Sequence, residues 1–519
     1  MNTSRGKILW VDDEINHLKP HIIFLEKKGY HVTTTTNGRD AVELVQSHSF
    51  DLILMDQFMP GIDGLETLER IKELNDAIPI ILITKSEEEW LMDEAITKKI
   101  DEFLVKPVRP TQIFIAAKKI LEANRIREDH ATAGYLKDFQ DIDARLGQHL
   151  DHAEWWDIYT RLVRWQLAFD EHRETGLGSI LAEQIQSSNR QFIQYVRKEY
   201  CYWLTTQDGP LTTVNIIPEY VIPRMEDNTK TCFIVIDSMR LDHLYAIMPE
   251  LQKYFTLRID PAVAILPSAT PFSRNAIFSG LYPDELLVKY PQQRAAMESH
   301  ASSLNQYENL FLEDLLKRHG QGGKSIHYHK IWQVDEGRKF SQRISEYLKV
   351  DLLAIVINFV DILAHKRSES DVLKEMLPDE SGYRSAVKTW FENSWFLDVL
   401  KRLSQSNYNV ILTSDHGSVR VNRGIPVGAD RDTSSGIRYK YGFNVNCSDR
   451  NSLVIKKPQE YRLPEFGPQT SYLIATDDVF FVYPTQQHKF ESLYKGSFQH
   501  GGISLEEMFI PVATLRPKY

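Results

Sequence analysis

Cys232-Phe-Ile-Val-Ile-Asp237 is a run of apolar residues that ends on a carboxylate, and the chain repeats this arrangement twice. Ile355-Val-Ile-Asn-Phe-Val precedes Asp361, and Val410-Ile-Leu-Thr-Ser precedes Asp415. Such runs predict buried strands of a parallel sheet. In an open α/β sheet the loops after these strands converge on one crevice, so we expect the carboxylates to meet there. A single Asp at a strand end is usually a turn or helix cap, so the prediction depends on the whole set.

Further polar residues extend this set, and each is expected where a strand runs out into a loop. The candidates are Asp237, Thr270, Asp361, His365, Asp415, His416 and His500. Carboxylates and imidazoles together are zinc ligands, and the oxygen ligands extend the choice to manganese. A hydroxyl nucleophile among them predicts a hydrolase.

The order of these residues resembles the alkaline phosphatase superfamily, in particular its PglZ branch. The segments that carry the resemblance are Asp237-Ser-Met-Arg240-Leu-Asp242, Ser268-Ala-Thr270-Pro-Phe-Ser-Arg274, Arg438-Tyr-Lys440 and His500-Gly-Gly-Ile-Ser-Leu-Glu-Glu507. It covers the chain from Lys230 to the C-terminus. It implies two metal ions, one held by Asp361, His365 and His500. The other would be held by Asp237, Thr270, Asp415 and His416.

The resemblance implies that Thr270 is the nucleophile, because a hydroxyl beside divalent cations loses its proton more readily. A phosphothreonine intermediate would form and later be hydrolysed by water. Two metals can stabilise the attacking and leaving oxygens of an in-line displacement at phosphorus. Arg274 or Asn275 is a candidate to hold a non-bridging phosphate oxygen, with packing and solvent-facing roles as the alternatives.

The first third of the chain alternates short apolar runs with helical periodicity, which predicts a parallel sheet covered on both faces. The five expected strands begin at Ile8, His31, Leu52, Ile80 and Phe103. Their ends carry Asp12, Asp13, Asp56, Thr84 and Lys106. Three carboxylates at one edge of a sheet favour a bound magnesium ion.

This pattern resembles a response-regulator receiver domain over its full length, with a (βα)5 fold. The resemblance implies that Asp56 accepts phosphate, that Asp12, Asp13 and Asp56 bind Mg²⁺, and that Thr84 and Lys106 bind the phosphoryl oxygens. One local residue agrees with the receiver family and another does not. Phe103 falls where an aromatic switch residue is usual, whereas Lys85 follows Thr84 where a small residue is more common. A cis-proline turn at Lys106-Pro107 and a helix cap at Asp12-Asp13 are the alternatives.

Residues 123–206 lack strand signals and repeat apolar residues at steps of three and four, which predicts a three-helix bundle. Trp156, Tyr159 and Val163 form one such stripe, which we interpret as core. We therefore expect an α/β multidomain protein. Its domains would be a receiver at 1–122, the helical linker at 123–206 and an alkaline-phosphatase-like domain at 207–519.

Composition limits the classes of partner. The 519 residues carry a net charge of -10 with a pI near 6.0, which opposes a broad nucleic-acid-binding surface, and no basic helix-turn-helix follows the receiver. The three cysteines are widely spaced and suit a reducing compartment. With no signal peptide and no apolar stretch near the ~20 residues that span a bilayer, we expect a cytoplasmic protein.

A receiver joined to a PglZ-type domain resembles a family of response regulators associated with type IX secretion in Bacteroidetes. That resemblance implies a sensor histidine kinase as phosphodonor, zinc in the effector, nucleotide or oligonucleotide phosphodiesters as substrates, and a homodimer on phosphorylation. The alternative is a regulator without enzymatic activity that contacts a sigma factor or secretion component, with a structural metal site. Thr270 separates the two, because a structural site has no need of a nucleophile.

Overall fold

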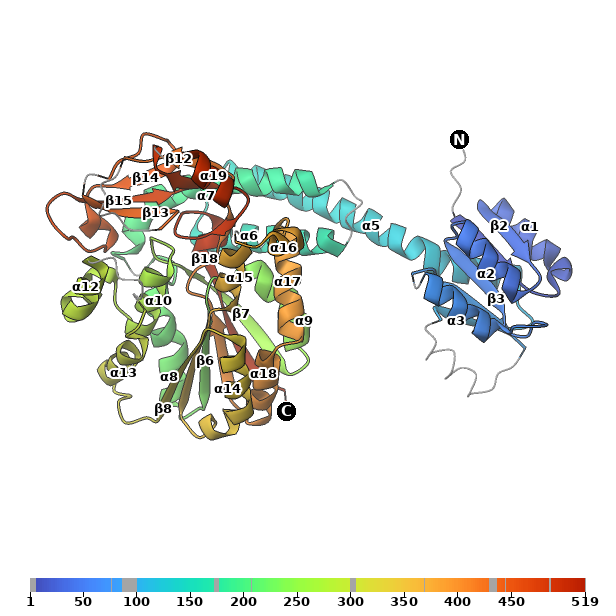
Figure 1. Ribbon diagram of the computed structural model, residues 1–519, viewed down its shortest axis with the longest axis horizontal. Coiled ribbons are helices and arrows are strands. Elements are labelled where there is room, and N and C mark those ends of the chain that lie inside the picture. The colour runs from blue at the N-terminus through green and yellow to red at the C-terminus, as the bar shows by residue number, and fades with distance from the viewer. Residues whose placement is uncertain are drawn as a thin grey trace. The chain divides into compact units, whose positions relative to one another are not determined.

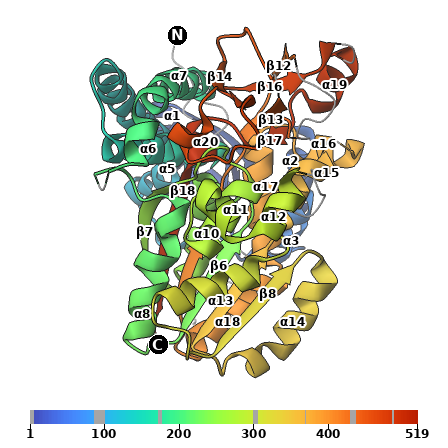
Figure 2. The same cartoon turned by 90° about the vertical axis from the view of Figure 1, so that its left-hand side faces the viewer.

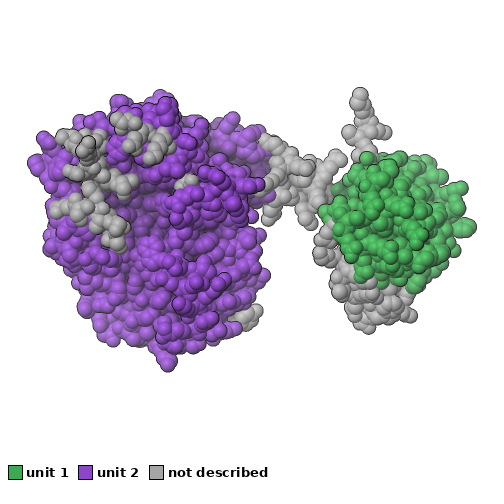
Figure 3. Space-filling model, in the orientation of Figure 1, with its two compact units in different colours: residues 1–134 green, residues 135–519 purple. Residues whose placement is uncertain are grey.

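The structure is a computed structural model that divides into two compact units, Met1–Gly134 and Tyr135–Tyr519 (Figure 3). It describes residues 6–75, 77–85, 100–171, 177–206, 208–298, 305–367, 369–428, 436–443, 445–484 and 487–518. Among these residues, no helix combines the length and hydropathy that crossing a membrane requires.

The first unit is a five-stranded parallel sheet in the order β2-β1-β3-β4-β5, as the sequence predicted. The strands are β1 (Gly6–Val11), β2 (Tyr30–Thr35), β3 (Leu52–Asp56), β4 (Ile80–Thr84) and β5 (Glu102–Val105). The described helices are α1 (Lys19–Lys27), α2 (Gly38–Ser47), α3 (Gly64–Leu74) and the start of α5 (Pro110–Leu146), with η1 (Ile15–Leu18) before α1. Successive β1 side chains alternate between two cores, with Ile8 and Trp10 in one and Leu9 and Val11 in the other. Both faces of the sheet are therefore covered, which confirms the receiver fold.

The helices of the middle segment do not stand apart from the effector. Helices α6 (His152–Glu171) and α7 (Leu177–Trp203) place Tyr159 and Phe192 against Phe509, with ring centroids 6.1 and 5.3 Å from it. Asp170 of α6 also pairs with the buried Arg384 at 2.7 Å. The structure therefore joins these helices to the C-terminal core in one compact unit. The division into 1–122, 123–206 and 207–519 remains a prediction.

The second unit is built on a six-stranded sheet in the order β7-β18-β10-β6-β9-β8. The strands are β6 (Thr231–Ile236), β7 (Phe255–Val263), β8 (Ile326–Ile331), β9 (Leu352–Ile357), β10 (Asn409–Thr413) and β18 (Phe509–Pro517). β8, β9, β6 and β10 run parallel, whereas β18 and β7 add an antiparallel edge. In β6, Phe233 and Val235 enter one core while Cys232, Ile234 and Ile236 enter the other. Burial on both faces explains its continuous apolar run.

Helices cover both faces of this sheet (Figures 1 and 2). The helices of this part of the unit are η3 (Thr213–Asn215), η4 (Ile217–Val221), α8 (Ile222–Glu226), α9 (Leu241–Leu251), α10 (Thr270–Ser279), α11 (Pro283–Lys289), α12 (Pro291–Glu298), α13 (Glu308–Arg318), α14 (Val334–Tyr347), α15 (Phe359–Arg367), α16 (Asp371–Met376), α17 (Glu380–Glu392) and α18 (Trp395–Gln405), and not all of them contact the sheet. Helix α10 packs over β6 and β8 through Phe278, whose ring lies 6.0 Å from Phe233 and 5.6 Å from Tyr328.

Smaller sheets make up the rest of the unit. β13 (Tyr439–Phe443), β15 (Thr470–Ala475) and β14 (Ser452–Ile455) form one, β12 (Arg423–Pro426) pairs with β16 (Val479–Val482), and β11 (Val419–Arg420) pairs with β17 (Phe498–Gln499). The remaining elements are η5 (Pro458–Tyr461), α19 (Gln487–Tyr494) and α20 (Leu505–Met508). Because β11 follows His416 and β17 precedes His500, their pairing brings these two histidines near each other.

Candidate metal centres

Two of the predicted carboxylates lie where neighbouring parallel strands end. Val235 of β6 pairs with Thr413 of β10, so the loops that begin with Asp237 and Ser414 leave the same edge of the sheet. The Ser238 backbone N–H donates to Asp415 Oδ1 at 3.2 Å and joins the two loops. Convergence at the carboxyl ends of the strands is the placement that the sequence predicted.

Asp361 is placed differently from the expectation. Strand β9 ends at Ile357, and Asp361 lies in the first turn of α15 rather than at a strand end. The apolar run continued past the strand because helix and strand cannot be told apart by a short apolar segment. The helix places His365 one turn after Asp361 on the same face, with Nε2 3.3 Å from Asp361 Oδ1.

The first candidate metal group is Asp361, His365 and His500, which each offer a ligand atom within 4.8 Å of the others. His500 Nε2 lies 3.6 Å from Asp361 Oδ1. Partial desolvation opposes a charge on His365, whose side chain is still 45% exposed, but the hydrogen bond and the charge of Asp361 outweigh it and raise the pKa of His365. Burial and the neighbouring His416 lower the pKa of His500 well below its usual value, which keeps this imidazole neutral and able to bind a cation.

The second candidate group is Asp237, Asp415 and His416, again within 4.8 Å of one another. All three side chains are buried, and His416 Nε2 is 3.7 Å from an oxygen of each carboxylate. Asp415 Oδ2 is buried without a hydrogen-bond donor among the described residues. Burial and the charge of Asp237 raise the pKa of Asp415 to about 7. A cation between these groups would remove that repulsion, so the donor set fits a metal ion.

The tautomer of His416 follows from its hydrogen bonds. Its Nδ1 lies 3.0 Å from the Gly417 carbonyl oxygen, which can only accept, so Nδ1 carries the proton. Nε2 is then an acceptor that faces Asp237 and Asp415. A backbone carbonyl that fixes the ring in this way is typical of metal-binding histidines.

Thr270 faces the second group from the start of helix α10. Its Oγ1 lies 3.0 Å from His416 Nε2 and 3.3 Å from Asp237 Oδ1. As the first residue of a ten-residue helix, it sits where unpaired N–H groups and the helix dipole favour an anion. The hydroxyl and a negatively charged substrate group can therefore share this position.

The two groups are adjacent. The rings of His416 and His500 stack with centroids 4.2 Å apart and an interplanar angle of 17°. The His365 side chain is 45% exposed, whereas that of His416 is fully buried. Substrate would therefore approach from the side of the first group.

The Arg274 side chain contacts carboxylates and does not take up the phosphate-binding position that the sequence suggested. It is buried, and its guanidinium donates to Asp237 Oδ2 and Glu308 Oε1, both at 2.6 Å. These bonds make it a support for a candidate ligand, because its donors are directed at carboxylates. Asn275 is also buried, donating to the Pro271 carbonyl oxygen at 2.9 Å and accepting from Asn305 at 2.9 Å.

Several residues support the candidate ligands in ways that the sequence did not indicate. Asn358 donates to Asp237 Oδ2 at 3.1 Å, and Glu308 balances the charge of Arg274. Arg438 and Glu507 form a fully buried ion pair at 2.7 Å beside the His500 loop. The sequence placed Arg438 and Glu507 in family-like segments without indicating that they pair.

The predicted phosphoacceptor site is assembled in the first unit. Asp12, Asp13 and Asp56 offer oxygens within 4.8 Å, and Lys106 Nζ lies 2.9 Å from both Asp12 and Asp56. Burial raises the pKa of Asp56, and Asp12 and Asp13 add to the rise although Lys106 opposes it. Thr84 ends β4 and is buried. Three acidic groups against one lysine fit an added divalent cation.

Comparison with protein families assigns each part of the chain. Residues 217–515, more than half of it, match the BREX system PglZ alkaline phosphatase-like domain. Residues 8–118 match the response regulator receiver domain, and residues 125–204 match the PorX response regulator linker domain. The combination is that of a PorX-like response regulator with a PglZ effector.

The individual relatives named here each match about a fifth to a quarter of the chain. Transcriptional regulatory protein ResD of Bacillus subtilis is 34% identical over 119 residues, which are 23% of this chain and 49% of ResD. Transcriptional regulatory protein ZraR of Escherichia coli is 39% identical over 101 residues, 20% of this chain and 23% of ZraR. The chain thus spans half or less of these relatives. A CheY-like receiver domain protein from Methanospirillum hungatei is 25% identical with a TM-score of 0.23, covering 23% of this chain and 97% of that structure.

Proposed function

The chain belongs to the PglZ alkaline phosphatase-like family, and from that premise we propose that it is a metal-dependent phosphodiesterase or phosphatase controlled by its own receiver domain. The observation that carries the proposal is the pair of adjacent ligand groups with the Thr270 hydroxyl facing one of them. A binding module would not need a hydroxyl in that position.

Two divalent cations, zinc or alternatively manganese, would be held by these groups. Asp361, His365 and His500 would hold one, and Asp237, Asp415 and His416, with Thr270, the other. When bound, the cations would lower the pKa of a hydroxyl and stabilise the charge that develops on phosphate oxygens.

Thr270 is the proposed nucleophile. Its Oγ1 would form the bond to phosphorus while the bond to the leaving oxygen breaks, which gives a phosphothreonine that water then hydrolyses. The hydroxyl lies 3.0 Å from His416 Nε2, which would be occupied by the cation, so its proton would pass to water, and the leaving oxygen would take up a proton from water. The amino end of α10 stabilises the negative phosphoryl group.

The receiver would regulate this reaction. A sensor histidine kinase is the proposed phosphodonor to Asp56, with Mg²⁺ at Asp12, Asp13 and Asp56, and with Lys106 and Thr84 on the phosphoryl oxygens. Phosphorylation would draw these groups together, repack Phe103 and favour a homodimer.

Nucleotide or oligonucleotide phosphodiesters are the proposed substrates, in the cytoplasm, with control of type IX secretion as the biological output. The match of residues 125–204 to the PorX response regulator linker domain supports that output. A second candidate is a regulator that contacts a sigma factor or secretion component and uses the metal site structurally. The buried Arg274, which partly neutralises Asp237, is the observation that favours it.

Thr270→Ala tests the catalytic proposal. The variant should keep its metal ions, measured by mass spectrometry of the elements, and lose hydrolysis in a screen of phosphomonoesters, diesters and short oligonucleotides. Thr389→Ala, an exposed threonine on α17, is the matched control and should keep full activity. Near-wild-type turnover in a fully metallated Thr270→Ala protein would refute the nucleophile assignment, whereas no turnover in the metallated wild type would favour the structural alternative.

A further inference from the structure

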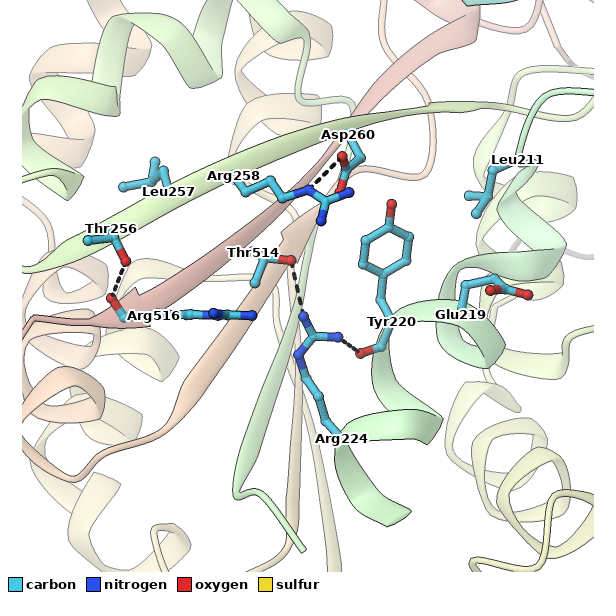
Figure 4. A pocket seen from close by; sticks show the side chains of 10 residues that line it. All are labelled: Leu211, Glu219, Tyr220, Arg224, Thr256, Leu257, Arg258, Asp260, Thr514 and Arg516. Carbon is cyan, nitrogen blue, oxygen red and sulfur yellow. Dashed lines mark hydrogen bonds and ion pairs between the residues drawn. The ribbon is translucent and has the colours of Figure 1, made fainter. Parts of the chain in front are cut away.

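A cavity of about 540 Å³ lies on the sheet of the second unit, away from the candidate metal centres. Its lining side chains are drawn in Figure 4. They are Leu211, Glu219, Tyr220, Arg224, Thr256, Leu257, Arg258, Asp260, Thr514 and Arg516. The proposed reaction does not use them.

The register of the sheet places most of this cavity's lining away from the metal centres. Leu515, which precedes Arg516, pairs with Val410 near the start of β10, whereas Asp415 follows the end of that strand. Arg258 pairs with Thr514 and Thr256 with Arg516, so side chains of the neighbouring strands β7 and β18 form one wall. Tyr220 of η4 and Arg224 of α8 lie across from that wall (Figure 4). Thr256, Arg258 and Arg516 therefore lie toward the amino end of the parallel strands, whereas Asp260, which pairs with Val512 beside Thr413, extends the lining toward the other end.

Three guanidinium groups line the cavity, and two of them form no ion pair with any described residue. Arg258 pairs with Asp260 at 3.0 Å. Arg224 instead donates to neutral oxygens, the Tyr220 carbonyl and Thr514 Oγ1. In the described part of the chain neither Arg224 nor Arg516 forms an ion pair. Burial, followed by the like charge of Arg516, lowers the pKa of Arg224.

The rest of the lining is mixed in character. The Tyr220 ring, Leu211 and Leu257 provide apolar surface, and the Thr514 hydroxyl lies beside Arg224. Glu219 and Asp260 are the acidic lining residues, and Arg258 already neutralises Asp260. The balance of three arginines against two carboxylates leaves the cavity positive.

We propose that this cavity is a second ligand site, which binds the phosphate group of a small phosphorylated molecule of mononucleotide size. A phosphate brings more than one negative charge and several acceptor oxygens. These match the guanidinium groups of Arg224 and Arg516, which form no ion pair with the described residues. The volume falls in the ~300–1,000 Å³ range of small-molecule sites, and the apolar lining suits a planar base. This site is independent of the proposed hydrolytic function.

Photolabelling of the metal-loaded full chain with 8-azido-AMP, followed by peptide mapping, distinguishes this site from the metal centres. Label is expected on peptides that contain Tyr220 or residues 256–260, and inorganic phosphate or AMP should compete with it. Adenosine, which lacks the phosphate, should not. Equal competition by adenosine and AMP would overturn phosphate recognition.

The arginine variants make the test specific. Arg224→Gln/Arg516→Gln should weaken labelling and AMP binding at this site roughly tenfold or more, because charge-assisted hydrogen bonds are lost. Arg516→Gln alone should show part of the loss, and because Arg516 is exposed the fold should tolerate it. Arg343→Gln, an exposed arginine paired with Glu346, controls for net charge and should bind as wild type. Unchanged binding in Arg516→Gln and in the folded double variant contradicts the proposal.

Discussion

Replacing Arg438 should destabilise the second unit and loosen both candidate metal groups. Arg438 and Glu507 are fully buried, and the guanidinium donates through Nε and Nη2 to the two carboxylate oxygens at 2.7 and 2.8 Å. Glu507 also accepts from Gly502 N at 2.8 Å, two residues after His500, and its carbonyl oxygen accepts from Gly417 N at 3.0 Å. One ion pair therefore anchors the loops that carry His500 and His416.

The loss of unfolding free energy depends on whether a substitution leaves an unpaired charge in the core. Arg438→Met leaves the buried Glu507 carboxylate without its ion-pair partner. Removing one partner of a buried pair lowers the free energy of unfolding by about 3–5 kcal/mol. Arg438→Met/Glu507→Gln should recover part of that loss, because the amide is neutral and its oxygen still accepts from Gly502 N. Arg343→Met changes an exposed pair and should stay within about 0.5 kcal/mol of wild type.

Urea unfolding of the full chain, followed by circular dichroism, measures these differences, and elemental analysis of the same samples reports bound metal. Arg438→Met should bind less metal than Arg343→Met because the two ligand loops lose their common anchor. A cost below about 1 kcal/mol for Arg438→Met, or a double variant less stable than the single one, would refute the reasoning.

Three further predictions address the metals, pH and regulation. Asp361→Asn should lower bound metal from about two ions to about one per chain by elemental analysis, whereas the exposed Asp371→Asn should not. Burial lowers the pKa of His243 from 6.5 to about 3. Between pH 3 and pH 6.5 His243 is protonated in the unfolded chain and neutral in the folded chain. The free energy of unfolding should therefore fall by about 1.4 kcal/mol per pH unit as the pH decreases. His243→Asn should flatten that slope when denaturation is measured as a function of pH. A small-molecule phosphodonor should shift the chain toward a dimer, measured by light scattering, and should change the rate of phosphodiester hydrolysis roughly 5–150-fold. An equal response in Asp56→Ala would contradict control by the receiver.

The fold of each unit was predictable where a strand is buried on both faces of its sheet, because such a strand is a continuous apolar run in the sequence. The apolar runs of β6 and β10 and their terminal polar residues could be located without coordinates because parallel strands require such runs. The carbonyl that orients His416 and the stacking of His416 on His500 could not be located in this way. They depend on backbone positions that residue identity does not encode.

The position of Asp361 shows the limit of local patterns. Its apolar run was interpreted as strand to the end, although the last part begins a helix. Arg274 shows a second limit, because a cation near a phosphate-binding threonine and a cation that neutralises Asp237 look alike in sequence. Only its burial against Asp237 and Glu308 distinguishes them.

The sequence by itself determined the receiver, the hydrophobic faces of the middle helices, and the identity and order of the candidate ligands, because these follow from periodicity and from the chemistry of residue types. The tertiary structure decided which surfaces those faces meet, and it placed α6 and α7 on the effector core. It also paired Arg438 with Glu507, 69 residues apart, and placed Arg224 and Arg516 in one cavity where, among the described residues, neither forms an ion pair. The physical reason is that burial and charge balance depend on all neighbours in space, whereas the sequence specifies only neighbours along the chain.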